Sequence, residues 1–114
     1  MTAISTHVLD TSRGRPASGI PITLEHQTAP QTWAPIGQGV TDADGRLRSL
    51  TSSGSSLVPG IYRLVFEVSD YFKSQGVRTF YPSVIVVFET VAGEPHYHVP
   101  VLLSPFGYST YRGS

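Results

Sequence analysis

The chain has no cysteine among its 114 residues. Disulfide bonds, thiolate metal sites and cysteine nucleophiles are therefore excluded, while the redox compartment stays open. No apolar run approaches the roughly 20 residues that a membrane helix needs, and the N-terminal residues lack the basic and apolar regions of a signal peptide. We expect a cytoplasmic protein without a membrane partner; the alternative is a periplasmic protein whose leader has been removed.

An excess of charge of either sign is also missing. Eight basic and eight acidic side chains give a formal net charge of +0, whereas a nucleic-acid-binding protein normally carries a basic patch. The chain also lacks a Gly-x-Ser-x-Gly elbow, a phosphate-binding glycine-rich loop and a dinucleotide fingerprint. These absences argue against nucleic-acid binders, serine-triad hydrolases and nucleotide-dependent enzymes.

Short strand patterns dominate the chain. Apolar and polar residues alternate over 20–25, and the denser apolar runs 61–68 and 84–88 are rich in β-branched and aromatic residues. Turn residues separate about seven or eight such strands, which is typical of a sandwich. The length fits one domain, 1–114. The sequence thus predicts a single all-β domain.

The connections carry their own signals. The segment 42–45 predicts a tight turn in which Gly45 takes a positive φ. The serine-rich segment 52–56 predicts a loop. One short helix is predicted over 69–75, capped by Ser69 and ended by Gly76.

Two strands present histidines on the face that points away from the core. By alternation, the outward residues are Ser5, His7 and Leu9 of the first strand, and His96, His98, Pro100 and Leu102 of a later one. Apolar residues on an outward face indicate an interface. The histidines are therefore expected in a groove between subunits, where partial desolvation lowers their pKa values and suits a general base.

The pair His96 and His98 admits two chemistries. Histidines two apart on one strand occur in zinc sites, with His7 as a third ligand. Neutral histidines also act as acid and base without a metal. No cysteine supports the zinc site, and the sequence favours the metal-free alternative, with no cofactor.

Two further groups could contact a substrate. Arg46 directly follows the predicted turn, and its guanidinium could hold a planar, carbonyl-rich ligand. The terminal Tyr111, Arg112, Gly113 and Ser114 continue a patterned strand region, although most chain ends carry no function.

Together these segments are similar to one known family over nearly the whole chain. The matching pieces are His7-Val8-Leu9-Asp10, Gly14-x-Pro16-Ala17, Thr41-Asp42-x-Asp44-Gly45-Arg46, Gly60-Ile61-Tyr62, Tyr71-Phe72, Phe80-Tyr81-Pro82, 96–105 and the ending Tyr111-Arg112-Gly113-Ser114. Each piece alone is weak, but their order and spacing are specific. The chain resembles the 5-hydroxyisourate hydrolases, or transthyretin-related proteins. The hormone carrier transthyretin shares the scaffold but lacks these histidines, Arg46 and this ending.

The resemblance implies an immunoglobulin-like, transthyretin-like sandwich of two four-stranded sheets with one short helix. It also implies a homotetramer, a dimer of dimers with active sites where the dimers meet. The implied catalytic residues are His7, Arg46, His98 and Ser114. The implied substrate-binding residues are His7, Arg46, Tyr111, Arg112, Gly113 and Ser114.

The implied reaction is hydrolysis of the N1–C6 bond of 5-hydroxyisourate to 2-oxo-4-hydroxy-4-carboxy-5-ureidoimidazoline, a step in urate degradation to allantoin. His98 or His7 would deprotonate the attacking water, and Arg46 would stabilise the oxyanion. The sequence does not decide between the two histidines, and the resemblance assigns no role to His96. The two rival functions are a ligand-binding module on the transthyretin scaffold and a zinc hydrolase.

Overall fold

In the computed structural model, which describes residues 3–51 and 57–114, the chain forms nine strands and one short helix. The strands are β1 (Ala3–Asp10), β2 (Arg15–Pro16), β3 (Pro21–Ala29), β4 (Thr32–Val40), β5 (Arg46–Leu47), β6 (Gly60–Glu67), β7 (Ser83–Thr90), β8 (His96–Ser104) and β9 (Gly107–Thr110). The helix is α1 (Ser69–Lys73). The loop predicted over 52–56 lies outside the described residues.

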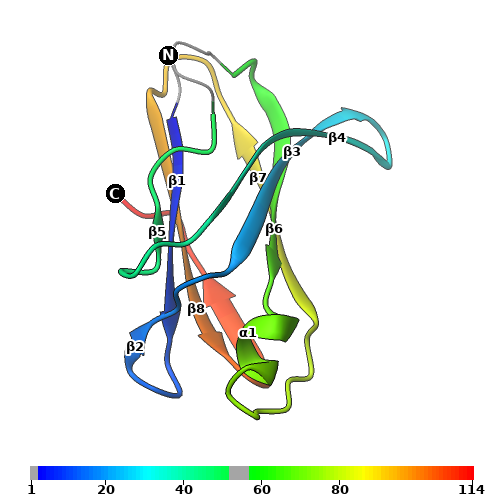
Figure 1. Ribbon diagram of the computed structural model, residues 1–114. Helices are drawn as coiled ribbons and strands as arrows, with labels where there is room; N and C mark the ends of the chain where they lie inside the picture. Colours follow the sequence, from blue (N-terminus) through cyan, green and yellow to red (C-terminus); the bar gives the residue numbers. More distant parts are fainter. Residues whose placement is uncertain (1–2, 52–56) are drawn as a thin grey trace.

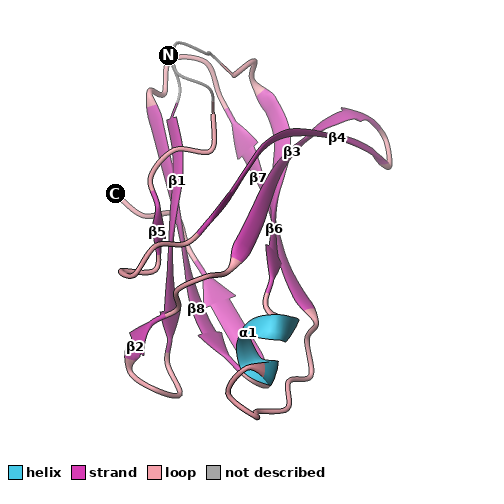
Figure 2. Ribbon diagram, viewed as in Figure 1, coloured by secondary structure: helices cyan, strands magenta, loops and turns pink. Residues whose placement is uncertain are grey.

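The strands form two facing sheets, so the prediction of an all-β sandwich is confirmed (Figure 1, Figure 2). One sheet has the order β4-β3-β6-β7. The other has the order β2-β1-β8-β9 and gains a fifth strand, because the two-residue β5 also pairs with β1. The expected count of four strands is therefore correct for one sheet only.

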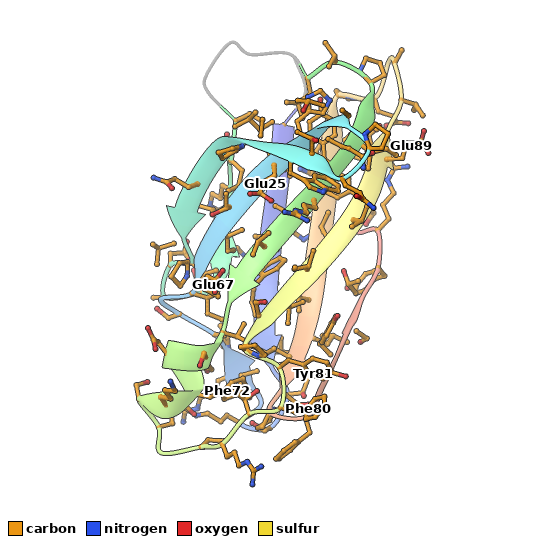
Figure 3. All side chains as sticks on the ribbon, turned by 90° about the vertical axis from the view of Figure 1, so that its right-hand side faces the viewer. Glu25, Glu67, Phe72, Phe80, Tyr81 and Glu89 are labelled. Carbon is orange, nitrogen blue, oxygen red and sulfur yellow. The ribbon has the colours of Figure 1, made fainter. Side chains whose placement is uncertain are left out.

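The core lies between the two sheets and follows the alternation in the sequence. Ile4, Thr6 and Val8 of β1 are buried, while the residues between them are half-buried. The other large, fully buried side chains are Ile20, Ile22, Leu24, Tyr62, Leu64, Phe66, Val68, Phe72, Val84 and Leu103. Figure 3 views the four-stranded sheet, with Phe72 on the helix at one end of the molecule and Glu89 at the other.

The helix begins where the sequence predicted but without the predicted cap. Val68 occupies the N-cap position, and no side chain caps the helix. The carbonyl of Pro82 instead accepts hydrogen bonds from the backbone N–H groups of Val68 and Ser69. A main-chain partner thus replaces the expected serine cap. Gly76 has a φ of 70° just after the helix, as predicted.

A buried carboxylate ties α1 to the first hairpin. Asp10 has no exposed surface, and its Oδ1 accepts hydrogen bonds from the backbone N–H and the hydroxyl of Ser12 at 3.0 and 2.6 Å. Its Oδ2 accepts a hydrogen bond from the hydroxyl of Tyr71 at 2.7 Å. Asp10 therefore stabilises the C-terminal end of β1.

Tyr71→Phe tests this contact. Loss of the hydroxyl removes one partner of a buried charged oxygen, and we expect the free energy of unfolding to fall by about 1–3 kcal/mol. Urea denaturation measures the change. The control is Tyr108→Phe, whose side chain is 40% exposed and should lose much less. Equal losses in the two variants would contradict a specific role for the bond to Asp10.

Candidate active site

Neighbouring strands of the five-stranded sheet bring the site residues together. The parallel pairing of β1 with β8 sets Ser5 opposite His98, and the antiparallel pairing of β1 with β5 sets His7 opposite Arg46. On the other edge of β8, Gly113 forms an isolated bridge with His98. The C-terminal segment leaves the sheet on the side away from the four-stranded sheet (Figure 1). Residues more than 90 positions apart thus meet on one outer face.

This face carries a hollow of about 300 Å³. Its lining residues are Ser5, Thr6, Arg46, Arg48, His96, His98 and Ser114. Two arginines and two histidines make the lining cationic or neutral but not acidic. Such a hollow suits a small ligand rich in carbonyl oxygens, because guanidinium groups present several fixed donors.

The tight turn before β5 holds Arg46 in place. Gly45 has a φ of 73°, as predicted, and a β-carbon there would lie 2.4 Å from the carbonyl oxygen of Val8. The Oδ1 of Asp42 accepts hydrogen bonds from the backbone N–H groups of Asp44 and Arg46, both at 2.9 Å. A side chain at position 45 would push the turn away from β1 and move Arg46 with it.

The same turn fixes the tautomer of the neutral His7 ring. Its Nε2 lies 2.9 Å from the carbonyl oxygen of Asp44. A carbonyl oxygen only accepts hydrogen bonds, so Nε2 carries the proton and Nδ1 is unprotonated in the neutral ring. His7 does not line the hollow itself.

His98 occupies a less solvated position. Its Nδ1 lies 2.9 Å from the hydroxyl of Ser5. Burial lowers the pKa of His98 below its usual 6.5, and the charges of His96, Arg46 and His7 lower it further. A histidine held neutral near pH 7 can accept a proton from water.

The lowered pKa of His98 predicts how stability depends on pH. Between the folded pKa and the ordinary 6.5, the unfolded chain binds more protons than the folded one. Stability is therefore fully present above about pH 6.5 and is lost as pH falls through the folded pKa. We expect His98→Gln to reduce this acid loss. Urea unfolding of both proteins at pH 8 and pH 5 measures it, and an unchanged acid loss would contradict the assignment.

Gly113 packs directly against the ring of His98. Its backbone N–H donates a hydrogen bond to the carbonyl of His98 at 2.8 Å. A β-carbon at position 113 would lie 2.5 Å from Cδ2 of His98. Only glycine leaves room for the imidazole in this position. Gly113 thus supports the position of His98, and its contact with substrate stays a prediction.

The structure divides the remaining C-terminal residues between two places. Ser114 lines the hollow with Arg46 and His98. Arg112 lies elsewhere: its guanidinium is 3.3 Å from the carboxylate of Glu94 and 4.9 Å from the ring centre of Tyr97. Tyr111 and Arg112 line a second, more apolar hollow of about 250 Å³ beside β7. A single chain does not bring these two residues to His98.

The apolar face that was expected around the histidines is only partly present. Leu102 is 36% exposed and Leu9 is half-buried, but Pro100 is buried within the single chain. The prediction that Pro100 contributes to an exposed apolar face is therefore wrong. Pro100 lies between β1, where it faces His7, and Thr110, whose hydroxyl donates to its carbonyl.

Sequence reasoning gave no catalytic or substrate-binding role to four lining residues, Ser5, Thr6, Arg48 and His96. Ser5 shares the outward face of His7, so alternation could have indicated it. Arg48 lies two positions from Arg46, but β5 ends at Leu47, and alternation does not extend reliably past a strand end. His96 was considered only as a zinc ligand beside His98, and the resemblance assigned it no role.

The zinc alternative receives no support from side-chain geometry. Within residues 3–51 and 57–114, no three or more histidine, aspartate or glutamate side chains are arranged to hold a metal ion. Nε2 of His7 is turned to the carbonyl of Asp44, and one nitrogen of each of the His96 and His98 rings faces Ser5.

The part of the chain that the structure describes contains no helix with the length and apolar character of a membrane span.

Comparison with known proteins agrees with the family motifs found in the sequence. Residues 4–113 match the model of the HIUase/Transthyretin family. This chain belongs to that family. Within the family, it is 44% identical to the 5-hydroxyisourate hydrolase of Mus musculus over 112 residues, which cover 97% of this chain and 94% of the relative. The resemblance drawn from the motifs is confirmed.

Solved structures of family members share the sandwich. The 5-hydroxyisourate hydrolase of Klebsiella pneumoniae superposes with a TM-score of 0.85 at 35% identity, covering all of both chains. Sea bream transthyretin in complex with thyroxine superposes with a TM-score of 0.89 at 33% identity, covering 97% of this chain and 94% of that one. An enzyme and a hormone-binding protein thus have nearly the same backbone, so the fold does not separate the two functions.

Proposed function

We propose that the protein hydrolyses 5-hydroxyisourate at its N1–C6 bond, giving 2-oxo-4-hydroxy-4-carboxy-5-ureidoimidazoline. The observation that carries this proposal is the pairing of His98, whose pKa is lowered, with Arg46 in one hollow. A neutral imidazole beside a fixed cation is what hydrolysis of a cyclic amide needs: a base for water and a donor for the oxyanion. The names of the relatives support the substrate.

The proposed mechanism divides the chemistry among four residues. Nδ1 of His98 faces Ser5, which leaves Nε2 to deprotonate the attacking water. Arg46 binds the ring of the substrate and stabilises negative charge on the C6 oxygen. Ser114, in the same lining, binds the substrate or helps to transfer a proton. His7 is the second candidate base through its unprotonated Nδ1 and otherwise orients the substrate beside Arg46.

We further propose that the enzyme is a homotetramer, a dimer of dimers, acting without a cofactor. Tyr111 and Arg112 lie outside the hollow of a single chain. Their expected contacts with substrate would then require the assembly to reshape or close the hollow. Sedimentation velocity tests the oligomeric state. A fully active monomer would contradict the proposal that the active site needs the assembly.

The direct test of function generates 5-hydroxyisourate in the cuvette from urate and uricase and follows its decay by ultraviolet absorbance. We expect the protein to accelerate the decay, with or without a chelator. Acceleration that the chelator abolishes would instead support a zinc hydrolase. No acceleration from folded protein would favour a ligand-binding module on the same scaffold, which should then retain a small aromatic ligand without turnover.

A further inference from the structure

A short side chain forms the floor of the hollow. Ser5 pairs across β1 with His98 on one side. On the other side, the antiparallel register pairs Thr6 with Leu47, so that Arg48, the next residue, follows beside Ser5. Neighbouring strands lie about 4.8 Å apart, and the small serine therefore leaves space between the longer side chains of Arg48 and His98. The hollow of about 300 Å³ includes this space, because all three residues line it.

Two guanidinium groups face this space without an ion-pair partner. Leu47 packs against the core, so Arg46 and Arg48 on either side of it emerge on the outer face. In the part of the chain that the structure describes, neither arginine forms an ion pair with a carboxylate. The charge of Arg48 is only a lesser cause of the lowered pKa of Asp42, after the hydrogen bonds from the backbone N–H groups of Arg46 and Asp44. Both guanidinium groups can therefore bind a ligand.

The proposed reaction creates a ligand for two such groups. The oxygen of water adds to C6 and the C6–N1 bond breaks. One proton of the water reaches N1, and the other stays on the new carboxylic acid. The acid loses this proton to solvent, because carboxyl pKa values lie at about 4. A full negative charge shared by two oxygens is thus present only in the product, where the carboxylate can turn about its one remaining bond to the ring.

We propose that Arg48 binds the carboxylate of the product together with Arg46. Arg46 contacts the oxygen that was the C6 carbonyl, and Arg48 contacts the oxygen that came from water. Guanidinium groups present several fixed donors, and carboxylate oxygens are their best acceptors. The inference rests on the proposed hydrolase function. It makes Arg48 a product-binding residue and makes the hollow selective for cyclic amides that carry a carboxylate.

The electrostatics of the hollow favour such an anion. No aspartate or glutamate side chain lines it. Burial lowers the pKa of His98, and the charges of His96, Arg46 and His7 lower it further, which indicates a positive potential around the imidazole. The same potential attracts a carboxylate and has little effect on an uncharged ring. Arg48 is exposed, so its contribution should weaken as salt is added.

Orotate and uracil are matched probes for this site. Both are planar pyrimidine rings with two ring carbonyl groups, and only orotate carries a carboxylate. In isothermal titration calorimetry with dilute buffer, we expect the protein to bind orotate at least about tenfold more tightly than uracil, as charge-assisted hydrogen bonds should provide. Added salt should remove most of this difference. Equal affinities for the two probes would overturn the proposal.

Variants of Arg48 test which residue causes the preference. Arg48→Gln should weaken orotate binding about tenfold and leave uracil binding unchanged, because the variant removes the charge but keeps a polar side chain. Arg48→Lys should recover part of the affinity, since lysine keeps the charge without the planar guanidinium. The matched control is Arg15→Gln, which removes an exposed arginine of β2 outside the hollow and should bind orotate normally.

Two results with these variants would contradict a carboxylate contact. Equal losses for orotate and uracil in Arg48→Gln would indicate a general disturbance of the hollow. Equal losses of orotate binding in Arg48→Gln and Arg15→Gln would indicate an effect of net charge alone. Either result would overturn the proposal.

Inhibition kinetics distinguish Arg48 from Arg46. The inhibition constant of orotate against 5-hydroxyisourate decay should rise about tenfold in Arg48→Gln. This variant should lose less of kcat than Arg46→Gln, because Arg46 stabilises charge in the transition state. Unchanged inhibition by orotate would overturn the proposal. If the wild-type protein fails to accelerate the decay, the proposed function fails, and the calorimetry still decides whether Arg48 makes the hollow a carboxylate site.

Discussion

His98→Gln is expected to lower kcat for 5-hydroxyisourate by about 10²–10⁴-fold, the usual contribution of a positioned acid or base. Glutamine is a polar side chain of similar length, but it cannot accept a proton at neutral pH. The loss should therefore appear in kcat, with the sandwich intact by circular dichroism. Stopped-flow or steady-state absorbance of the decaying substrate measures it.

The pH profile distinguishes a base from a mere contact. With His98 as the base, kcat should fall at acid pH with an apparent pKa below the ordinary 6.5, because burial and the neighbouring positive charges disfavour the imidazolium. His98→Gln should abolish this limb, and His26→Gln should leave it unchanged. Near-normal turnover in both His98→Gln and His7→Gln would refute the mechanism.

Gly113→Ala is expected to have the second largest effect, about 10²-fold on kcat, although it adds a single methyl group. The added carbon would lie 2.5 Å from Cδ2 of His98, so the imidazole or the C-terminal strand must move. A displacement of about 1 Å at a reacting group can cost about 10²-fold. The stability should change much less than the activity, because the bridge lies near the chain end.

Gly107→Ala is the matched control for this variant. Gly107 belongs to β9, on the same C-terminal segment, and a β-carbon there would meet only the hydroxyl of Ser104, at an ordinary 3.7 Å. We expect its kcat to be unchanged. If Gly113→Ala is as active as Gly107→Ala, then the contact between Gly113 and the imidazole does not position His98.

Several features of the site follow from local rules. Alternation along β1 and β8 correctly turned His7, His96 and His98 to the outer face, because successive side chains on a strand point to opposite sides. The turn at Gly45 was likewise predictable, since its positive φ favours glycine. Local periodicity does not reveal which strands are neighbours.

Strand pairing decided what the histidines contact. The parallel register of β1 and β8 sets Ser5, not His7, opposite His98. A shift of one residue would have turned Ser5 to the core. The pairing thus brings the hydroxyl of Ser5 within 2.9 Å of His98, a contact that the pattern of a single strand does not specify.

By itself, the sequence determined the all-β class, the family, the outward placement of the histidines and the turn that presents Arg46. Periodicity, turn residues and ordered motifs are local properties, so they can be identified from the amino-acid sequence alone. Only the tertiary structure decided that Gly113 packs on His98, that Arg112 turns to Glu94, and that Pro100 is buried. These outcomes depend on contacts between strands distant in sequence and on the space that each side chain occupies, which no local pattern specifies.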